Sequence, residues 1–387
     1  METLDPSEAS ERFSVLDYNI LGEYCATTAL YGYTPSGALS WEYRRDLILE
    51  EIKKRDADIV CLQEVNTESY NEFFRRELAF HFYKGAFWPR SRARTMAEKE
   101  ARLVDGCATF YKVQKYIMLD KQVIDFANAA INRPDMKGEH DIFNRVMPRD
   151  HIAVVTFFEN RITGSRMIVV NTHTYWDPAF ADVKLVQVAI LMEQVTKLAN
   201  RWATFPPCTD KQLFRHTEQD NELGPDIPEE LQVEYGPSVE YSTGSQIPLV
   251  VSGDFNSEQH TGVYDLLNCG ALPGDHPDLA KRAYGNLTRD GMAHPFTLKS
   301  AYGEQMAFTN YTPDYTAIID YIWYSSNSLT VKQLLGDVDR LHLQRIPGFP
   351  NFYFPSDHLP LFVEFSVEPK KERPKAVEAD FGSQRNR

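Results

Sequence analysis

Polar side chains that could do chemistry occur at six places where an apolar, strand-like run ends or is interrupted. The places are Asn19, Gln63-Glu64, Asn171-Thr172-His173, Gly253-Asp254-Phe255-Asn256, Asp320 and Ser356-Asp357-His358. Acids and amides are rarely buried without a partner. Any one of them could be only a strand end capped by a turn, and Asp254 to Asn256 could be only an Asx turn. Six such places, offering carboxylate, carboxamide and imidazole groups but no thiol, favour a functional site.

The chemistry that these groups could perform together is coherent. Oxygen ligands suit a hard cation, and Mg²⁺ binds through one or two carboxylates while it keeps waters and substrate phosphate oxygens. Hydrolysis of a phosphodiester needs an activated water, neutralised phosphoryl charge and a stabilised leaving oxygen, which metal ions and a carboxylate base supply together. An imidazole can donate to the phosphate. The residue types therefore point to a magnesium-dependent phosphodiesterase.

The hydrophobic pattern predicts the elements that must position these residues. A helix is expected over residues 41–55, with Ser40 as its N-cap, and an amphipathic helix fits residues 180–199. Strands are expected at residues 15–21, 59–62, 106–111, 152–158, 167–172, 248–252, 318–324 and 361–365. Helices and strands interleave along the chain, which predicts an α/β fold.

Composition limits the class of protein. Of the 387 residues, 43% are apolar, which is enough for a full core, and no run approaches the roughly 20 apolar residues of a membrane helix. The N-terminus lacks the basic and apolar regions of a signal peptide. The five cysteines are widely spaced with no C-x-x-C pair, which is typical of free thiols in a reducing compartment. We therefore expect a cytoplasmic protein that could also enter the nucleus and has no membrane partner.

The net charge of −14 is unevenly distributed. Residues 208–241 carry nine acids and two bases, a net charge of −7, which is half of the net charge of the whole chain. This charge argues against tight binding to long duplexes, which needs a basic face, but leaves short single strands open. One catalytic domain is expected over residues 12–366, after a flexible N-terminus at 1–11 and before a disordered charged tail at 367–387. An acidic flexible insertion is expected at about 204–245.

The motifs, in their order, resemble the endonuclease/exonuclease/phosphatase superfamily. The resemblance rests on Asn19 and on the segments Leu62 to Val65, Ser252 to Ser257, Ile319 to Ile322 and Ser356 to Pro360. It extends over residues 12–366 and implies a four-layer α/β sandwich of two packed β-sheets flanked by helices, with the site at one end of the sheets.

The same resemblance implies the roles of the catalytic residues. Glu64 holds Mg²⁺ with Asn19 beside it, and Asp254 activates the attacking water and touches a second metal ion, so that two ions are expected. The other implied roles concern the scissile phosphate. Asn256 and His173 contact it directly, and His358, oriented by Asp320, donates to one of its oxygens.

Longer segments resemble the nuclease domain of the carbon catabolite repression family of mRNA deadenylases. They are Tyr31 to Pro35, Leu39 to Arg45, Ser91 to Met96, Val104 to Ala108, Asn144 to Met147 and Asn171 to Pro178. This resemblance implies a 3′-to-5′ exoribonuclease that removes poly(A) tails, releases 5′-AMP and belongs to a large deadenylating complex. Enzymes of that family carry a leucine-rich repeat region ahead of the nuclease. That docking region is absent here, so binding of a partner through it is not implied.

The resemblance also implies residues that select the substrate. In that family a proline and an aromatic ring hold the terminal adenine between them, and Pro178 and Tyr315 fill those two places. Without the resemblance, Pro178 could be only a turn after a strand and Tyr315 only a packing ring. Glu100 and Asn310 match positions that contact the nucleotide. The implied substrate-binding set is completed by Glu64, His173 and Asn256.

Two other functions remain open from the sequence. One is a nocturnin-like phosphatase that acts on a dinucleotide cofactor with the same metal chemistry, although the segments at 41–45 and 104–107 look nearer to the deadenylases. The other is a catalytically dead scaffold that binds RNA or protein, against which the complete catalytic set argues. The basic clusters at Arg44-Arg45 and at Arg90 to Arg94 are each either a solvated face or a surface that steers the RNA backbone.

Overall fold

The structure of the chain is a computed structural model that describes residues 11–212 and 235–368. Residues 1–10, 213–234 and 369–387 lie outside the described residues. These ranges include most of the expected N-terminus and charged tail and the centre of the expected acidic insertion. The expected flexibility of these segments therefore stays a prediction.

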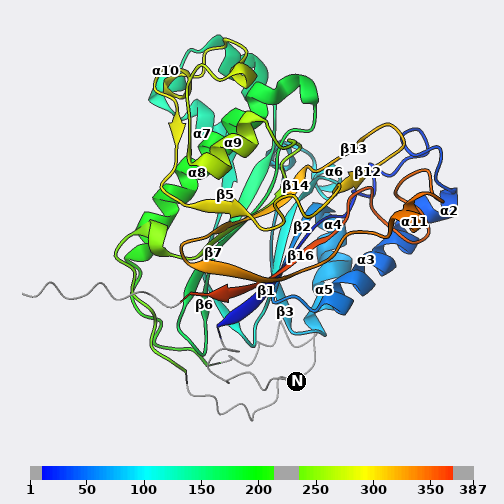
Figure 1. The fold of residues 1–387 in the computed structure, drawn as a ribbon, viewed down its shortest axis with the longest axis horizontal. Helices are drawn as coiled ribbons and strands as arrows, with labels where there is room; N and C mark the ends of the chain where they lie inside the picture. Colours follow the sequence, from blue (N-terminus) through cyan, green and yellow to red (C-terminus); the bar gives the residue numbers. More distant parts are fainter. Residues whose placement is uncertain (1–10, 213–234, 369–387) are drawn as a thin grey trace, which may run out of the picture.

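Two six-stranded mixed sheets form the centre of the fold (Figure 1). In the first, neighbouring strands follow the order β15-β16-β1-β2-β4-β3, and in the second β11-β14-β8-β7-β6-β5. The first sheet consists of β1 (Arg12–Asn19), β2 (Ile59–Asn66), β3 (Tyr83–Pro89), β4 (Asp105–Lys112), β15 (Leu329–Leu334) and β16 (Leu361–Val367). The second consists of β5 (Tyr116–Asp125), β6 (Ile152–Asn160), β7 (Arg166–His173), β8 (Leu249–Asp254), β11 (Leu298–Ser300) and β14 (Asp320–Ser325). Two short pairs join β9 (Ala271–Leu272) to β10 (Met292–Ala293) and β12 (Asn310–Tyr311) to β13 (Thr316–Ala317).

Helices cover the outer faces of both sheets, with α3 on one side and α8 on the other (Figure 1). The α-helices are α2 (Ser36–Leu39), α3 (Trp41–Arg55), α4 (Thr67–Ser69), α5 (Arg75–Ala79), α6 (Glu98–Ala101), α7 (Phe126–Ile131), α8 (Ala181–Ala203), α9 (Gly262–Cys269), α10 (Asn286–Arg289) and α11 (Arg340–Leu343). Single turns of other helix types are η1 (Tyr70–Phe74), η2 (Ser91–Thr95), η3 (Pro134–Met136), η4 (Ile142–Val146), η5 (Pro178–Phe180), η6 (Gly244–Gln246) and η7 (Pro277–Leu279). None of the helices in the described ranges combines the length and apolar character needed to cross a membrane.

The alternation of side chains along each strand builds the layers. In β1, Val15 packs between the two sheets with Val169 and Val250, whereas its neighbour Leu16 packs on the other face with Ile48 of α3. Successive side chains of a strand point to opposite faces, so one strand supplies both the inner and the outer core. The four-layer α/β sandwich expected from the resemblance is confirmed.

The topology brings the polar strand ends to one edge of the sandwich. β1 and β2 are parallel and end side by side, and β7 and β8 are parallel, with His173 beside Asp254. β14 runs antiparallel to β8, so that its first residue, Asp320, pairs with Asp254. β16 runs antiparallel to β1, and its start therefore follows His358 at the same edge.

The described flanks of the expected acidic insertion pack against the second sheet. Lys211 is buried, and its Nζ lies 2.6 Å from Oε1 of Glu159 in β6. The backbone N–H of Gly236 donates to the carbonyl oxygen of Ile162 at 2.7 Å. These contacts hold the two sides of the segment to the fold next to residues 213–234, which are not described.

Candidate active site

The carboxylate of Asp254 lies at the centre of the site. Its Oδ2 accepts a hydrogen bond from Nδ2 of Asn19 at 3.0 Å, and it lies 3.5 Å from Nε2 of His173 and 3.8 Å from Nε2 of His358. Its Oδ1 accepts the backbone N–H of Asn256 at 2.8 Å. These residues come from β1, β7, β8 and the segments that follow β8 and precede β16. Side chains far apart in the sequence thus converge on one oxygen atom.

The environment of Asp254 suits it to accept a proton near neutral pH. Burial and the neighbouring carboxylate of Asp320 raise the pKa of Asp254 to about 7, against the opposing effect of His358. A general base works best when its pKa lies near the working pH. The site therefore holds a carboxylate whose basicity suits the activation of water.

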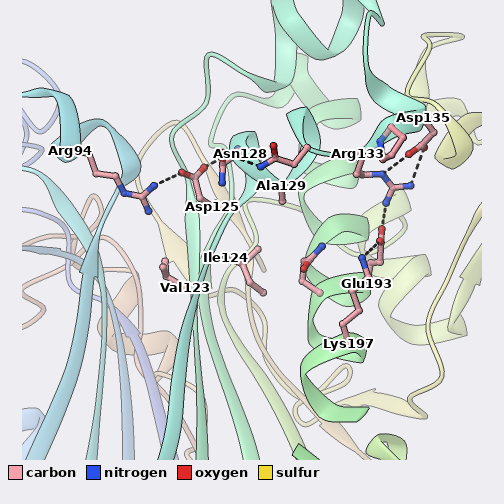
Figure 2. Close-up of a pocket in the computed structure, with 13 residues that line it drawn as sticks. Arg94, Val123, Ile124, Asp125, Asn128, Ala129, Arg133, Asp135, Glu193 and Lys197 are labelled. Carbon is pink, nitrogen blue, oxygen red and sulfur yellow. Dashed lines mark hydrogen bonds and ion pairs between the residues drawn. The ribbon is translucent and has the colours of Figure 1, made fainter. Parts of the chain in front are cut away.

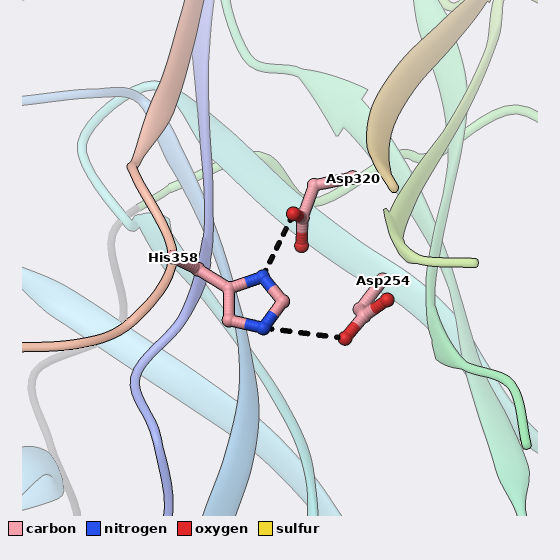
Figure 3. Close-up of side chains that lie close together, drawn as sticks. All are labelled: Asp254, Asp320 and His358. Atoms are coloured by element: carbon pink, nitrogen blue, oxygen red, sulfur yellow. Dashed lines mark hydrogen bonds and ion pairs between the residues drawn. The ribbon is translucent and has the colours of Figure 1, made fainter. Parts of the chain in front are cut away.

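Asp320 and His358 form a buried pair beside Asp254 (Figure 3). Nδ1 of His358 lies 2.8 Å from Oδ2 of Asp320. Burial lowers the pKa of His358, but the carboxylates of Asp320, Asp357 and Asp254 outweigh it and hold the pKa well above its usual range. These carboxylates favour the imidazolium form of His358, whose Nδ1 donates to Asp320 while its Nε2 points toward Asp254 at 3.8 Å.

Glu64 reaches the site because the strand that carries it is bulged. The pairing of β2 with β4 shifts between Gln63 and Val65, and Glu64 between them has a left-handed φ of 61°. A bulge of this kind re-aims a side chain and is frequent next to active sites. Oε1 of Glu64 accepts from Nδ2 of Asn19 at 3.1 Å, and Oε2 accepts from the backbone N–H of Gly22 at 2.7 Å. Asn19 thus bridges Glu64 and Asp254.

The end of β8 and the turn that follows it also have an unusual backbone. Gly253 has a φ of 142°, and a Cβ at this position would lie 1.9 Å from the carbonyl oxygen of Thr172 in β7. Only glycine allows β7 and β8 to approach so closely here. Asn256 has a left-handed φ of 46°, and its Nδ2 donates to the carbonyl oxygen of Thr174 at 3.1 Å. The predicted phosphate-contacting amide is thus fixed between the ends of β7 and β8.

Arg90 organises the second imidazole of the site, a role that sequence reasoning did not assign. Its Nε donates to Oδ2 of Asp105 at 2.7 Å, Nη1 contacts Nε2 of His151 at 2.6 Å, and Nη2 contacts Nδ1 of His173 at 3.3 Å. Because a guanidinium only donates, Nδ1 of His173 must accept and Nε2 must carry the proton. Burial and Arg90 lower the pKa of His173 well below its usual range. His173 is therefore neutral, with its Nε2–H aimed at Asp254.

A buried polar network lies between the sheets beneath the site. Nε2 of Gln63 donates to Oδ1 of Asp17 at 2.8 Å and to Oδ1 of Asn171 at 2.9 Å, and Asn171 donates to the Ala108 carbonyl oxygen at 2.9 Å. Burial and the charges of Asp320 and Asp254 raise the pKa of Asp17 well above its usual range. Asp17 was not predicted from the sequence as part of the site. Its spacing of two residues from Asn19 could have indicated it, because residues two apart in a strand lie on one face.

The predicted nucleotide-binding residues differ in how closely they join this site. Asn310 is buried, and its Nδ2 donates to Oδ2 of Asp357 at 3.2 Å. Tyr315 is 43% exposed, with its hydroxyl donating to Oε1 of Glu258 at 3.2 Å. Pro178 is exposed at the start of η5. Glu100 is exposed on α6 and, within the described residues, forms no side-chain hydrogen bond or ion pair with the site.

The donor set at this edge fits a divalent cation. Candidate ligand atoms of Asp254, Asp320 and His358 lie within 4.8 Å of one another, but a protonated His358 has no free nitrogen lone pair, so the carboxylate oxygens are the ligands available here. Burial and the charges of Asp105 and Asp357 raise the pKa of Glu64, which marks an excess of carboxylate charge. Within the described part of the chain, Oδ1 of Asp357 is buried without a hydrogen-bond partner. Carboxylate oxygens without thiolate are the ligands that hard divalent cations prefer.

A separate groove of about 610 Å³ lies between β5, α7 and α8 (Figure 2). Its basic side chains are neutralised by neighbouring carboxylates: Arg94 pairs with Asp125, Arg133 with Asp135 and Glu193, and Lys197 with Glu193. It contains none of the groups that surround Asp254. We therefore assign the chemistry to the strand ends and not to this groove.

Sequence comparison finds close relatives along the whole chain. The profile of the Endonuclease/Exonuclease/phosphatase family matches residues 18–358. A protein of Phaeosphaeria nodorum is 58% identical over 388 residues, which cover 100% of this chain and 64% of the relative. One of Aspergillus terreus is 58% identical over 384 residues, covering 99% of this chain and 56% of the relative. Both are named CCR4-Not complex 3'-5'-exoribonuclease subunit Ccr4, and the chain spans less than two thirds of the length of either.

Solved structures agree with the fold. ANGEL2, a 2',3'-cyclic phosphatase, has a TM-score of 0.67 and 24% identity, with 92% of this chain and 96% of that chain covered. The human Nocturnin catalytic domain has a TM-score of 0.56 and 22% identity, with 92% and 95% covered. At these identities the structures support the shared architecture alone. From its profile match, its two-sheet sandwich and its similarity to the two fungal proteins along the whole of this chain, the chain belongs to the endonuclease/exonuclease/phosphatase family.

Proposed function

We propose that this chain is a Mg²⁺-dependent 3′-to-5′ exoribonuclease that shortens poly(A) tails and releases 5′-AMP. The observation that carries the proposal is the convergence of Asn19, His173 and His358 on the buried carboxylate of Asp254. The exoribonuclease activity is further supported by the printed names of relatives that are 58% identical to this chain. The preference for adenosine is supported by the resemblance of the motifs around Pro178 and Tyr315.

Glu64 and Asp254 are the residues that would hold Mg²⁺, with two ions expected. When bound, the cation neutralises phosphoryl charge and makes a bound water more acidic. Asn19 supports this role because its amide contacts both carboxylates and fixes their separation. Its Oδ1 accepts the backbone N–H of Leu21 at 3.1 Å, which sets the orientation of the amide.

Asp254 acts as the general base in the proposed reaction. It takes a proton from the attacking water, whose oxygen forms a bond to the phosphorus of the terminal phosphodiester. The bond from phosphorus to the 3′ oxygen of the preceding nucleotide breaks, and that oxygen takes a proton from solvent. The products are 5′-AMP and an RNA one nucleotide shorter with a free 3′ hydroxyl. A pKa of about 7 for Asp254, raised by burial and Asp320, suits this step at neutral pH.

The two imidazoles stabilise the negative charge of the phosphate. His358, kept protonated by Asp320, Asp357 and Asp254 against the effect of burial on its pKa, donates from Nε2 to a phosphate oxygen. His173 donates from Nε2 as a neutral ring, because Arg90 occupies its Nδ1. Fixed donors in a buried site stabilise a transition-state charge more than mobile water does.

The proposal is tested with a 5′-labelled RNA that ends in an oligoadenylate tail, beside the same RNA ending in cytidines. With Mg²⁺, we expect a ladder that shortens from the 3′ end and stalls at the first nucleotide that is not adenosine. Chelation of the metal should stop it, and added Mg²⁺ should restore it. Phosphate release from a dinucleotide cofactor without any ladder would favour the nocturnin-like reaction, and inactivity in both assays would favour a scaffold.

The partner and the location of the protein are also proposals. We propose that the chain works as an exonuclease subunit of a CCR4-Not complex, as its relatives are named, and that it acts in the cytoplasm. The five cysteines are all free, which supports a reducing compartment. Co-purification of the tagged protein with other subunits of a CCR4-Not complex, and its recovery in the soluble cytoplasmic fraction, are the expected results.

A further inference from the structure

Trp176 is an exposed ring next to the active site. It lies in the loop between β7 and η5, and its side chain is 64% exposed, whereas Trp202 and Trp323 are fully buried. Within the described residues, its one aromatic ring partner is Tyr175, with the centroids 6.0 Å apart and the planes at 54°. Burying an aromatic side chain stabilises a protein far more than leaving it in water. Packing of the fold therefore does not explain an indole at this position.

The loop holds Trp176 in a fixed position relative to Asp254. The backbone N–H of Thr174 donates to the carbonyl oxygen of Asp254 at 2.9 Å. The backbone N–H of Tyr175 donates to Oε1 of Gln187 at 2.9 Å, and its ring packs perpendicular to that of Phe180 at 5.2 Å. A surface that is already ordered loses little conformational entropy when a ligand binds.

Arg149 places a positive charge, which has no carboxylate partner among the described residues, over the rings of Tyr175 and Phe180. The carbon of its guanidinium lies 4.3 Å from the centroid of the Tyr175 ring and 4.7 Å from that of Phe180. Within the described residues it forms no ion pair, and its buried Nε has no hydrogen-bond partner. Two other arginines of the region differ, since Arg92 pairs with Asp150 and Arg145 pairs with Asp182. The charge of Arg149 is therefore available to an anion.

We propose that Trp176 and Arg149 form a second nucleotide subsite, which binds the nucleotide on the 5′ side of the scissile phosphate. This inference rests on the proposed exoribonuclease function. Trp176 and Arg149 are linked through Tyr175, which contacts both of them. An exposed aromatic face together with an unneutralised cation is the combination that binds single-stranded nucleic acid, through base stacking and contact with the backbone. The Cα atoms of Trp176 and Pro178 are at most about 7 Å apart, because only Asp177 lies between them. When the last base of an RNA strand stacks on Pro178, the preceding nucleotide is therefore within reach of Trp176.

The subsite holds the strand but does not select the base. Stacking tolerates every base, since each has a flat face. Adenine selection stays with the pocket for the terminal nucleotide. The chemistry of Trp176 and Arg149 therefore predicts tighter binding of any 3′ strand and a stronger dependence of binding on salt.

Two substrates separate the subsite from the catalytic centre. One is an RNA with an oligoadenylate 3′ end, and the other is adenosine 5′-(p-nitrophenyl) phosphate, which carries the terminal adenosine but no preceding nucleotide. For Trp176→Ala, kcat/KM on RNA should fall roughly 5- to 150-fold further than on the ester. Trp176→Phe should recover most of the loss, because it keeps a flat ring. For Arg149→Gln, the slope of log kcat/KM on RNA against log salt should weaken by about 0.7.

Matched controls come from the opposite end of the first sheet. Phe80 is 56% exposed just after α5, and Arg76 lies on α5, so Phe80→Ala and Arg76→Gln remove an exposed ring and a surface cation there. Neither control should change the ratio of the two activities. Equal losses of Trp176→Ala on RNA and ester, or no loss on RNA, would overturn the subsite. A wild-type enzyme that hydrolyses the ester but does not shorten RNA would instead refute the proposed function, and the subsite with it.

Discussion

Replacement of Asp320 by asparagine removes the charge that holds His358 protonated while it keeps the shape of the side chain. Oδ2 of Asp320 lies 2.8 Å from Nδ1 of His358, and both residues are buried. Asparagine can still accept a hydrogen bond from Nδ1 through its amide oxygen. The variant therefore separates the charge of Asp320 from its place in the fold.

The expected loss follows from the kind of hydrogen bond that is weakened. A hydrogen bond to a charged group contributes about 1.5–3 kcal/mol. If that contribution is present in the transition state, kcat/KM falls roughly 10- to 150-fold. The pH dependence changes in a defined direction as well. Asp320 raises the pKa of His358, so its neutralisation lowers that pKa, and His358 loses its proton at a lower pH. Activity that needs the imidazolium should then decline at a lower pH than in the wild type.

The assay is kcat/KM on adenosine 5′-(p-nitrophenyl) phosphate measured across pH, with thermal unfolding as a check on the fold. Asp275→Asn is the matched control, because Asp275 is exposed and distant in sequence from the site motifs. The control should keep the rate and the pH profile of the wild type. A variant whose rate falls while the alkaline decline stays at the wild-type pH would refute the role assigned to Asp320.

Three further predictions concern stability and substrate binding. Burial and the charges of Asp320 and Asp254 raise the folded-state pKa of Asp17, so its contribution to stability is complete below the unfolded pKa and is lost as pH rises. Asp17→Asn, which resembles the protonated form, should raise the free energy of unfolding by about 1–3 kcal/mol at alkaline pH and by less in acid, measured by urea denaturation. An equal change at every pH would argue against a titrating Asp17. Gly253→Ala should destabilise the protein by more than about 3 kcal/mol, because its Cβ would lie 1.9 Å from the carbonyl oxygen of Thr172, whereas Gly336→Ala should be tolerated in thermal unfolding. Tyr315→Ala should lower kcat/KM on oligoadenylate roughly 5- to 150-fold while affecting a simple phosphodiester less, and equal losses on both would count against base stacking.

The sequence predicted the principal strands and the meeting of their polar ends. Asn19, His173 and Asp254 each end a buried strand, and the ends of parallel neighbouring strands lie together, so these side chains meet once the topology is fixed. The helix over Trp41–Arg55 was predicted with its bounds, because Ser40 caps it by accepting from the backbone N–H of Tyr43.

Two strands, β3 and β5, were not predicted because their sequences lack a clear strand pattern. β3 was missed because Gly85 and Pro89 argue against a strand. Gly85 is needed there, since a Cβ would lie 2.6 Å from the hydroxyl oxygen of Tyr70. β5 was missed because it is an edge strand with side chains that are mostly half-buried, which leaves no clear apolar alternation.

Two features of the site depend on tertiary contacts that no local pattern encodes. Arg90 belongs to a basic cluster that resembled a solvated face, and only the fold brings it against Asp105, His151 and His173. Glu64 was predicted as a ligand, but its left-handed backbone depends on the bulge between β2 and β4.

The most direct test of the central claim is the fate of water oxygen in the product. Oligoadenylate is digested in ¹⁸O-water by the wild type and by Asp254→Asn, and the released nucleotide is analysed by mass spectrometry. The account predicts 5′-AMP from the wild type with a single ¹⁸O on its phosphate, and near-complete loss of that product in a variant that remains folded. Release of a 3′-phosphate, 5′-AMP without ¹⁸O, or an undiminished rate for Asp254→Asn would contradict it.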